Sequence, residues 1–520
     1  MMGLTRGTRK HLTQAARGIL ALLFLACLPL AALAHAKLVR SQPKAKDVLS
    51  NVPKLVELWF NEELDASPGL NTIEVKDQKG ARVDHGEVTL SEGNKKALVK
   101  LGELGSGTYT VSWKAVASDE HAMRGTFTFS VATPNVTPTT TPPTGLATVS
   151  PGPPPSPNDQ VSAIGSEQDQ IDQIEWGQTL VRWLSYLALM MLFGGFAFRS
   201  LVLVPSVRRA LPGEVGQAMR VSERRVLLFS WISTGLLFIT SFAALALQAS
   251  TVFDKPLSEA LSPTMLVRVL GTGYGRSWIL QITSTVIIAL ILILLTRRTK
   301  RHASSESSGL WWAGLVATAV LLIAPSWTGH AMASVKEFRL AVFTDWLHLL
   351  AGGFWVGGLF HLAVSWPPAL SPVPKQRRPL VLHHVIKHFT RIAMPSVVLL
   401  VLAGLYNTWS HIPRLQAFWM TAYGKALGLK LLLVALMLLL GAINNYHFGK
   451  RAARLVKREE SLNDSEASKL ERGFCRSVVF EAALGAVVLL VTAVLVFLTP
   501  ARSHPAMTDS GPGQMLSRDR

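Results

Sequence analysis

An aspartate and a histidine interrupt the apolar stretch AVFTDWLHLLAGGFWVGGLF at residues 341–360. At helical spacing Asp345 and His348 are three residues apart, so their side chains share one face. Burying either group in a lipid bilayer costs free energy. Insertion scales put that cost at about 2.5 to 3.5 kcal/mol for an aspartate at the centre of a membrane helix. Ionisable side chains in a membrane span therefore predict a functional site, and imidazole is a common transition-metal ligand. The alternative is that Asp345 only hydrogen-bonds a neighbouring helix.

Composition places this stretch in a membrane protein with an additional domain. Of the 520 residues 49% are hydrophobic and 16% are charged, and the apolar residues are concentrated after residue 176. The formal charge of +19 comes from Lys and Arg clusters between apolar runs. This pattern is typical of membrane topology and not of nucleic-acid binding.

Known enzyme motifs are missing from the sequence. The two cysteines, Cys27 and Cys475, are too far apart to suggest a disulfide framework or a thiolate metal site. No nucleotide-binding loop, acyl-phosphate motif or catalytic triad is apparent. We therefore expect a protein that is not an enzyme.

Residues 1–34 have the pattern of a secretory signal peptide. Basic residues precede a short apolar run that ends in Ala32-Leu33-Ala34, which predicts cleavage after Ala34. A lipidated Cys27 is the alternative, although Phe24-Leu25-Ala26 matches that motif poorly. Cleavage after Ala34 makes His35 the mature amino terminus, with a free amine beside its imidazole.

Residues 35–132 read as a small all-β domain. Short β-prone runs such as KLVELWF, NTIEVKD and GTYTVSWKAV alternate with Gly, Pro, Asn and Asp turn signals. Roughly seven short strands in about 100 residues predict a Greek-key, immunoglobulin-like sandwich.

Within this domain, Asp119 and His121 alternate by two and point the same way on an extended segment. Together with the amine and imidazole of His35 they would form a site of nitrogen and oxygen ligands. Tetragonal sites of this kind suit Cu(II).

The segments HAKLVRSQPKAKDVLSNVPKLVELWFNEEL and WKAVASDEHAMRGTFTFSV resemble the periplasmic copper-binding CopC family. The resemblance implies a β-sandwich that binds copper, with His35, Asp119 and His121 as the Cu(II) ligands. Glu120 departs from the family, which usually has Gly there. The domain also lacks a Met-rich segment, since it holds only Met123, so no separate Cu(I) site is expected.

After the sandwich, residues 133–175 are rich in Pro, Thr and Ser and predict an extended tether. Residues 176–500 then predict an all-α, polytopic membrane domain of about eight transmembrane helices, followed by an extracytoplasmic tail at 501–520. Small residues in the fifth span would allow another helix to approach closely: Gly352, Gly353, Gly357 and Gly358. The eight apolar runs cover residues 176–204, 226–250, 276–296, 309–329, 338–364, 391–411, 425–447 and 477–499.

Basic residues set the predicted orientation. If the sandwich is exported, the loops placed in the cytoplasm are rich in Lys and Arg, whereas the outer loops hold only Lys255, Arg268, Lys336 and Arg414. The positive-inside rule thus predicts a multi-pass protein of the inner or plasma membrane, with its amino-terminal domain outside.

The second half resembles the CopD family of copper-resistance membrane proteins. The resemblance is carried by YGKALGLKLLLVALMLLLGAINNYHF, by SWTGHAM and by DWLHLLAGGFWVGGL. Together the two resemblances imply a CopC–CopD fusion that imports copper. The expected partners are copper ions and the lipid bilayer, with no nucleic acid and no protein partner identified.

Histidines at different depths suggest a path for copper, because imidazole is a suitable copper ligand. His348 with Asp345 is expected near the midplane. His383, His384 and His388 fall in a predicted cytoplasmic loop, and this group and His411 are expected to have structural or interfacial roles. The candidate path, ordered from the outer face inward, is His330, Asp345, His348, His361 and His447.

Two other functions fit the residues. In the first, membrane histidines such as His330, His348 and His447 are axial ligands of a b-type haem in a membrane oxidoreductase. In the second, the membrane part only anchors a copper-binding or sensing sandwich.

Overall fold

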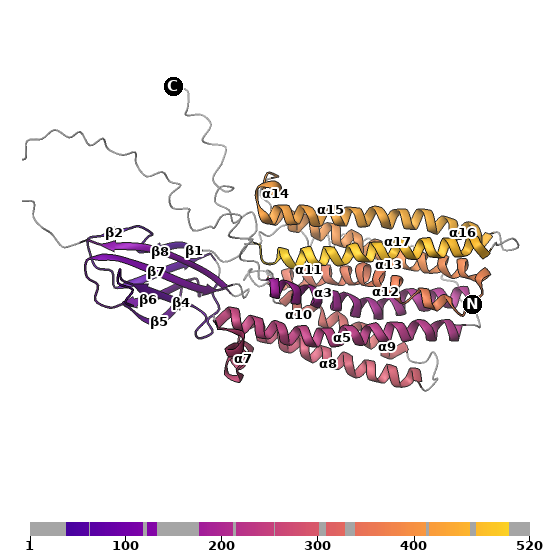
Figure 1. Cartoon of the computed structure of the whole chain (residues 1–520), viewed down its shortest axis with the longest axis horizontal. Coiled ribbons are helices and arrows are strands. Elements are labelled where there is room, and N and C mark those ends of the chain that lie inside the picture. Colours follow the sequence, from indigo (N-terminus) through magenta and orange to yellow (C-terminus); the bar gives the residue numbers. More distant parts are fainter. Residues whose placement is uncertain are drawn as a thin grey trace, which may run out of the picture.

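The protein consists of a β-sandwich at one end of a long helical bundle (Figure 1). The computed structural model describes residues 38–61, 63–117, 122–132, 176–211, 215–253, 255–300, 308–327, 338–411, 415–457 and 464–498.

Two four-stranded sheets form the sandwich, which confirms the predicted fold class. In spatial order, the first sheet holds β1 (Leu38–Gln42), β3 (Leu55–Phe60), β6 (Lys96–Leu101) and β5 (Asp84–Ser91). The second holds β2 (Val48–Leu49), β8 (Ala122–Val131), β7 (Gly107–Val116) and β4 (Thr72–Lys76).

The sandwich core follows from alternation along the strands. In β3 every second residue is buried, and Val56 and Leu58 are at most 1% exposed. Val75 from β4 and Val111 from β7 meet them from the opposite sheet in one apolar cluster. Period-two patterning thus places the apolar faces of the two sheets against each other.

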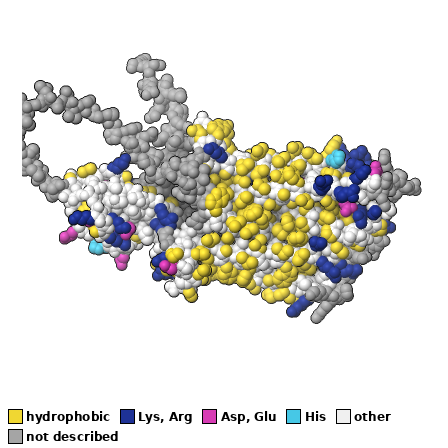
Figure 2. Space-filling view, in the orientation of Figure 1, with side chains coloured by type: hydrophobic (Ala, Val, Ile, Leu, Met, Phe, Trp, Pro, Cys, Tyr) yellow, Lys and Arg dark blue, Asp and Glu magenta, His cyan; other side chains and the backbone are white. Residues whose placement is uncertain are grey.

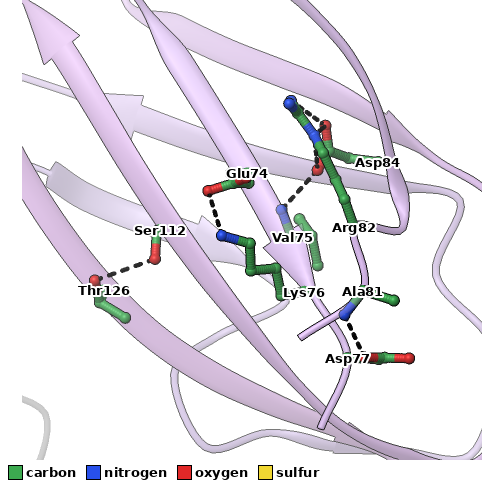
Figure 3. Close-up of polar contacts among 9 residues, drawn as sticks. All are labelled: Glu74, Val75, Lys76, Asp77, Ala81, Arg82, Asp84, Ser112 and Thr126. Atoms are coloured by element: carbon green, nitrogen blue, oxygen red, sulfur yellow. Dashed lines mark hydrogen bonds and ion pairs between the residues drawn. The ribbon is translucent and has the colours of Figure 1, made fainter. Parts of the chain in front are cut away.

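A polar network at the edge of the sandwich ties β5 to β4 (Figure 3). The Asp84 carboxylate accepts hydrogen bonds from Arg82 at 2.8 Å, from the Val75 backbone N–H at 2.7 Å and from the Gly86 backbone N–H at 2.9 Å. Burial of Asp84 disfavours its charge, but these hydrogen bonds outweigh burial and lower the pKa of Asp84 below its ordinary value. This carboxylate is therefore a structural element of the sandwich.

The bundle is built from long apolar helices with short turns of π-helix (η2, η4 and η7) and of 3-10 helix (η5 and η6) between them. Its elements are α3 (Trp176–Ala197), η2 (Phe198–Leu203), α4 (Val204–Ala210), α5 (Val215–Phe253), α6 (Leu257–Ala260), α7 (Pro263–Leu270), α8 (Gly273–Lys300), α9 (Ser308–Leu321), α10 (Ile323–Trp327), α11 (Phe338–Gly352), η4 (Gly353–Gly357), α12 (Gly358–Val364), η5 (Pro367–Leu370), η6 (Lys375–Arg377), α13 (Arg378–His411), α14 (Ala417–Met420), α15 (Ala422–Ile443), η7 (Asn444–Gly449), α16 (Lys450–Lys457) and α17 (Asp464–Leu495).

Eight stretches of the described chain are long and apolar enough to cross a membrane, as predicted. They cover Trp176–Ala210, Met219–Phe253, Gly273–Thr299, Gly309–Trp327, Val342–Val364, Lys375–Leu405, Ala422–Val456 and Ser465–Leu495.

The sixth span differs from the prediction. Its helix α13 already begins at Arg378, whereas the apolar run alone suggested residue 391. Because of this early start, His383, His384 and His388 lie on a helix and not in a loop, which corrects the sequence reading. The helix continues through polar residues because its buried apolar residues, including Val381 and Val385, pack into the bundle core.

Glycines in the fifth span let it contact the first span directly. A Cβ atom on Gly357 would lie 2.0 Å from the Met190 carbonyl oxygen, and one on Gly194 would lie 2.3 Å from the Gly357 backbone. Neither position can hold a larger residue without moving a helix. This close backbone approach is the packing that the small residues predicted.

The two ends of the bundle differ in charge. Lys and Arg side chains gather at the end opposite the sandwich, and hydrophobic side chains cover the length between (Figure 2). We call these the basic end and the sandwich end. Exposed residues of the basic end include Arg208, Arg209, Arg224, Arg225, Arg297, Arg298, Lys375, Arg377, Lys450, Arg454, Lys469 and Arg472.

The sandwich contacts the carboxyl-terminal end of α5. The Lys114 ammonium group donates a hydrogen bond to the Val252 carbonyl, and Arg124 donates one to the Thr251 carbonyl at 3.5 Å. Val116 packs against Val252 in a small apolar cluster. The last carbonyls of a helix lack partners within it and carry partial negative charge, so two cations of β7 and β8 cap α5.

Candidate functional site

The predicted Cu(II) ligands His35, Asp119 and His121 lie outside the described residues, and so does His330. The strands on either side of Asp119 and His121 are described, however. β7 and β8 pair down to Val116 opposite Ala122, so residues 118–121 connect the two strands of one hairpin. This end of the hairpin also carries the contacts of Lys114 and Val116 with α5.

Inside the bundle, Asp345 and His348 both lie on α11, as predicted. The Asp345 carboxylate lies near Ser326 of α10 and within electrostatic range of Tyr186 of α3. Within the described chain, the buried Nδ1 atom of His348 has no hydrogen-bond partner. An imidazole nitrogen that carries a lone pair and has no hydrogen-bond partner can accept a proton or a metal ion.

A lysine that the sequence analysis missed belongs to the same group. Lys430 of α15 acts electrostatically on both Asp345 and His348, and Asp345 acts on Lys430 in return. Lys430 is therefore within electrostatic range of both groups. The signal was present in the sequence, because Lys430 interrupts an apolar run just as Asp345 does.

Helical rise puts these groups at one depth. Trp346, next to Asp345, donates a hydrogen bond to the Ala319 carbonyl at 2.8 Å. The fourth span ends at Trp327, at the sandwich end of the bundle. Ala319 lies eight residues before Trp327, which places it about 12 Å from that end at a rise of about 1.5 Å per residue. Lys430 lies eight residues after Ala422, which is again about 12 Å. We call Asp345, His348 and Lys430 the upper station.

His361 also belongs to the predicted path, and its two ring nitrogens are already engaged. Its Nε2–H donates to the Met191 carbonyl at 2.9 Å, and its Nδ1 lies 2.9 Å from the Ser365 hydroxyl. The side chain is 0% exposed, with Phe198 and Phe229 against its ring. This arrangement holds α12 against α3 and engages both ring nitrogens.

His447 lies on η7, and its side chain is exposed on the outside of the bundle. The roles that we predict for His361 and His447 in copper passage stay predictions. Their surroundings differ from those of His348, because one is fully hydrogen-bonded and the other faces outward.

The basic end holds the cluster that includes His384 and His388. His388 is 7% exposed, and its Nε2 atom lies 2.7 Å from Nη1 of Arg209. Its Nδ1–H donates to the His384 carbonyl at 2.8 Å. The described residues contain no group of three or more His, Cys, Asp or Glu side chains that could hold a metal ion. The contact of His388 with Arg209 connects α13 to α4, and the structural or interfacial role of this group stays a prediction.

A second buried carboxylate lies on α17. Glu481 is 2% exposed and accepts a hydrogen bond from Nδ2 of Asn444 at 2.9 Å. This bond joins η7 to α17. We call Glu481 and Asn444 the lower station.

Family models divide the chain as the fold does. The CopC domain matches residues 38–132, the N-terminal domain of copper resistance protein D-like proteins matches 173–337, and copper resistance protein D matches 383–495. The chain belongs to the CopC–CopD copper-resistance family.

Several relatives of this CopC–CopD protein are named for copper transport or copper resistance. The "Copper transport protein CutJ" of Bacillus subtilis is 28% identical over 94% of this chain and 78% of its own length. "Copper resistance protein C" of Pseudomonas syringae pv. tomato is 35% identical over 19% of this chain and 81% of its own length. A solved structure of the "Methionine Rich Copper Resistance Protein" PcoC from Escherichia coli is 30% identical, with a TM-score of 0.17, over 19% of this chain and 99% of that chain. The prediction of copper as the bound metal is thereby confirmed at the level of the family.

Proposed function

We propose that this CopC–CopD protein imports copper across the plasma membrane. The sandwich lies outside and captures Cu(II) through His35, Asp119 and His121. The bundle then conducts copper past His330 and the upper station toward the basic end. No chemical conversion of an organic substrate is part of this proposal.

The contact between the sandwich and α5 is the observation that carries the proposal. The hairpin whose connection contains Asp119 and His121 meets the bundle at the sandwich end through Lys114, Arg124 and Val116. The upper station lies only about 12 Å below that end. Copper released by the sandwich therefore starts close to the nearest described membrane ligand.

Charge supports the orientation. The basic end carries most of the exposed Lys and Arg of the bundle, as expected of a cytoplasmic face. Copper that enters from the sandwich thus moves inward. The tether then serves to keep an undocked sandwich close to the membrane.

Copper uptake into proteoliposomes by the purified full-length protein tests the function. We compare it with His348→Ala, with His447→Ala and with a version that lacks residues 35–175. We expect flux in the full-length protein, a loss of at least about tenfold in His348→Ala because its ligand lies in the path, and a partial loss without the sandwich. We expect a smaller loss in His447→Ala, because this histidine of the predicted path is exposed and water can replace its imidazole as a ligand.

Two results would overturn the proposal. Tight vesicles with folded protein and no flux in any version favour an anchored copper-binding module. A Soret band in the absorption spectrum that disappears with His348→Ala favours the haem-binding oxidoreductase.

A further inference from the structure

Three cationic side chains meet where α4 packs against α13, at the basic end of the bundle (Figure 2). Arg209 comes from α4, and Lys387 and Arg391 come from α13. All three lie within electrostatic range of the imidazole of His388, and all three are exposed. Two helices therefore bring three positive charges to one exposed seam.

His388 fixes the position of Arg209. The Nδ1–H of His388 donates to the His384 carbonyl at 2.8 Å and also lies 3.2 Å from Oγ of Ser206 on α4. In this neutral form of the ring, Nε2 carries a lone pair and accepts a hydrogen bond from Nη1 of Arg209 at 2.7 Å. A guanidinium group has five N–H donors in a fixed fork, so most of those of Arg209 remain for another partner.

No carboxylate is paired with these cations among the described residues. Two acidic side chains of the same end, Glu223 and Glu471, each pair with another arginine, at 2.7 and 3.3 Å. Arg209 has a neutral imidazole as its recorded partner, and neither Lys387 nor Arg391 forms an ion pair within the described chain. Like charges this close together repel one another, so the seam is complementary to an anion.

The three cations lie at the depth of lipid phosphate groups. The last part of α13, from Ile392 to His411, contains no Lys, Arg, Asp or Glu. It is about 20 residues long, which is the length that crosses the hydrocarbon core of a bilayer. Arg391 directly precedes this part and Lys387 lies one turn before it, so both are expected at the headgroup level of the leaflet at the basic end.

An exposed apolar stripe continues from the cations along α13. Met394, Val398 and Leu405 follow Arg391 at helical spacing on the same face, and all three are exposed. One face of α13 thus carries positive charge first and apolar side chains next, in the order in which a phospholipid carries its phosphate and its acyl chains.

We propose that Arg209, Lys387 and Arg391 bind the phosphate group of an anionic phospholipid in the leaflet at the basic end. An acyl chain of this lipid lies along Met394 and Val398. Basic pockets between membrane helices are a known form of lipid recognition, and the fork of an arginine matches phosphate geometry. The bound phosphate offsets the repulsion among the cations and thereby holds α4 against α13.

Charge complementarity selects this occupant. A zwitterionic lipid brings its own cation to the seam, and a second copy of the chain brings the further Lys and Arg side chains of its basic end. An anionic phospholipid brings only negative charge to the same place. The proposal goes beyond copper import and does not depend on it, because the seam is the same whether or not copper crosses the membrane.

Native mass spectrometry of the full-length protein in detergent tests the site, with phosphatidylglycerol or phosphatidylcholine added. We expect the wild type to bind phosphatidylglycerol more tightly than phosphatidylcholine. Each Lys or Arg near an anionic lipid contributes about fivefold in affinity. The double variant Lys387→Gln with Arg391→Gln should therefore bind phosphatidylglycerol about 25-fold more weakly and phosphatidylcholine as before, and Arg209→Gln should lose about fivefold.

Two matched variants serve as controls. Arg298→Gln removes an exposed cation of the same end that lies on α8, outside the seam, and should behave as the wild type. The exchange Lys387→Arg with Arg391→Lys keeps both charges and should keep the preference. Phosphatidylglycerol should also raise the unfolding temperature of the wild type and of the exchange variant, but not that of the double Gln variant.

Three results would overturn the inference. Equal affinity of the wild type for the two lipids removes the anionic site, and an equal loss in Arg298→Gln means that only the total charge matters. A double Gln variant that changes from dimer to monomer with lipid binding unchanged would make the seam an interface between two copies of the chain.

Discussion

Two buried carboxylates, one in the sandwich and one in the bundle, have opposite surroundings. Asp84 accepts hydrogen bonds from Arg82 and from two backbone N–H groups. Glu481 has one amide donor, and the other oxygen-bearing group beside it, Oδ1 of Asn444, lacks a partner in the described chain. A carboxylate with a full set of donors has its charge compensated and stabilises the fold, whereas one with a single amide donor has much less compensation.

The histidines of α11 and α12 show the same contrast within one span. His361 uses both ring nitrogens to hold the bundle together, and His348 leaves Nδ1 without a partner among the described residues. Both came from the same sequence argument, since each is a histidine in an apolar run. Only the packing distinguishes them.

This contrast predicts different losses on truncation. His361→Ala leaves the Met191 carbonyl and the Ser365 hydroxyl without their partner and opens a cavity, so we expect a loss above about 3 kcal/mol in stability. His348→Ala breaks no hydrogen bond among the described residues and should cost about 1 kcal/mol or less in stability while copper flux is lost. Denaturant unfolding in detergent, followed by tryptophan fluorescence, measures both. Equal losses would remove the distinction between a structural and a functional histidine.

The sandwich side of the comparison is tested by pH. Asp84→Ala removes hydrogen bonds to a charged group and should cost the sandwich, residues 35–132, about 1.5 to 3 kcal/mol near pH 7. Because the pKa of Asp84 is lowered on folding, its charged form stabilises the fold above its ordinary value of 3.8. That contribution disappears as the pH falls through the lower pKa of the folded protein.

Urea unfolding at several pH values measures this effect in the isolated sandwich. The domain by itself matches 81% of the length of a separate curated protein, so it is a reasonable unit to express. Glu74→Gln is the control, since its exposed ion pair with Lys76 should contribute less than about 1 kcal/mol. A difference between the wild type and Asp84→Ala that stays constant into acid would contradict the structural role of this carboxylate.

Much of this architecture could be predicted because the patterns are strong. Alternation of apolar residues gave a sandwich, and eight apolar runs gave eight spans. The start of α13 could not be predicted, because hydropathy reports where a helix meets lipid and not where its backbone hydrogen bonds begin. The residues before 391 are helical although they are polar.

The site was predictable only in part. Asp345 and His348 were found because charge in an apolar run is costly, and Lys430 would have followed from the same rule. The saturation of His361 and the open Oδ1 of Asn444 depend on neighbours more than thirty residues away, such as Met191 and Glu481. No local pattern records such partners.

The contact between the sandwich and the bundle allows the test with the smallest expected effect. Lys114→Gln removes a cation from the end of α5, where a charge near a helix terminus contributes about 0.3 to 2 kcal/mol. If this contact docks the sandwich, the loss of docking lowers the effective copper concentration at the sandwich end. The copper concentration that gives half-maximal uptake should then rise by about two- to thirty-fold, while the maximal rate stays unchanged. Lys76→Gln, on the neighbouring strand but paired with Glu74, should leave half-saturation unchanged. An equal shift in both variants would mean that net charge, and not the cap on α5, sets delivery to the bundle.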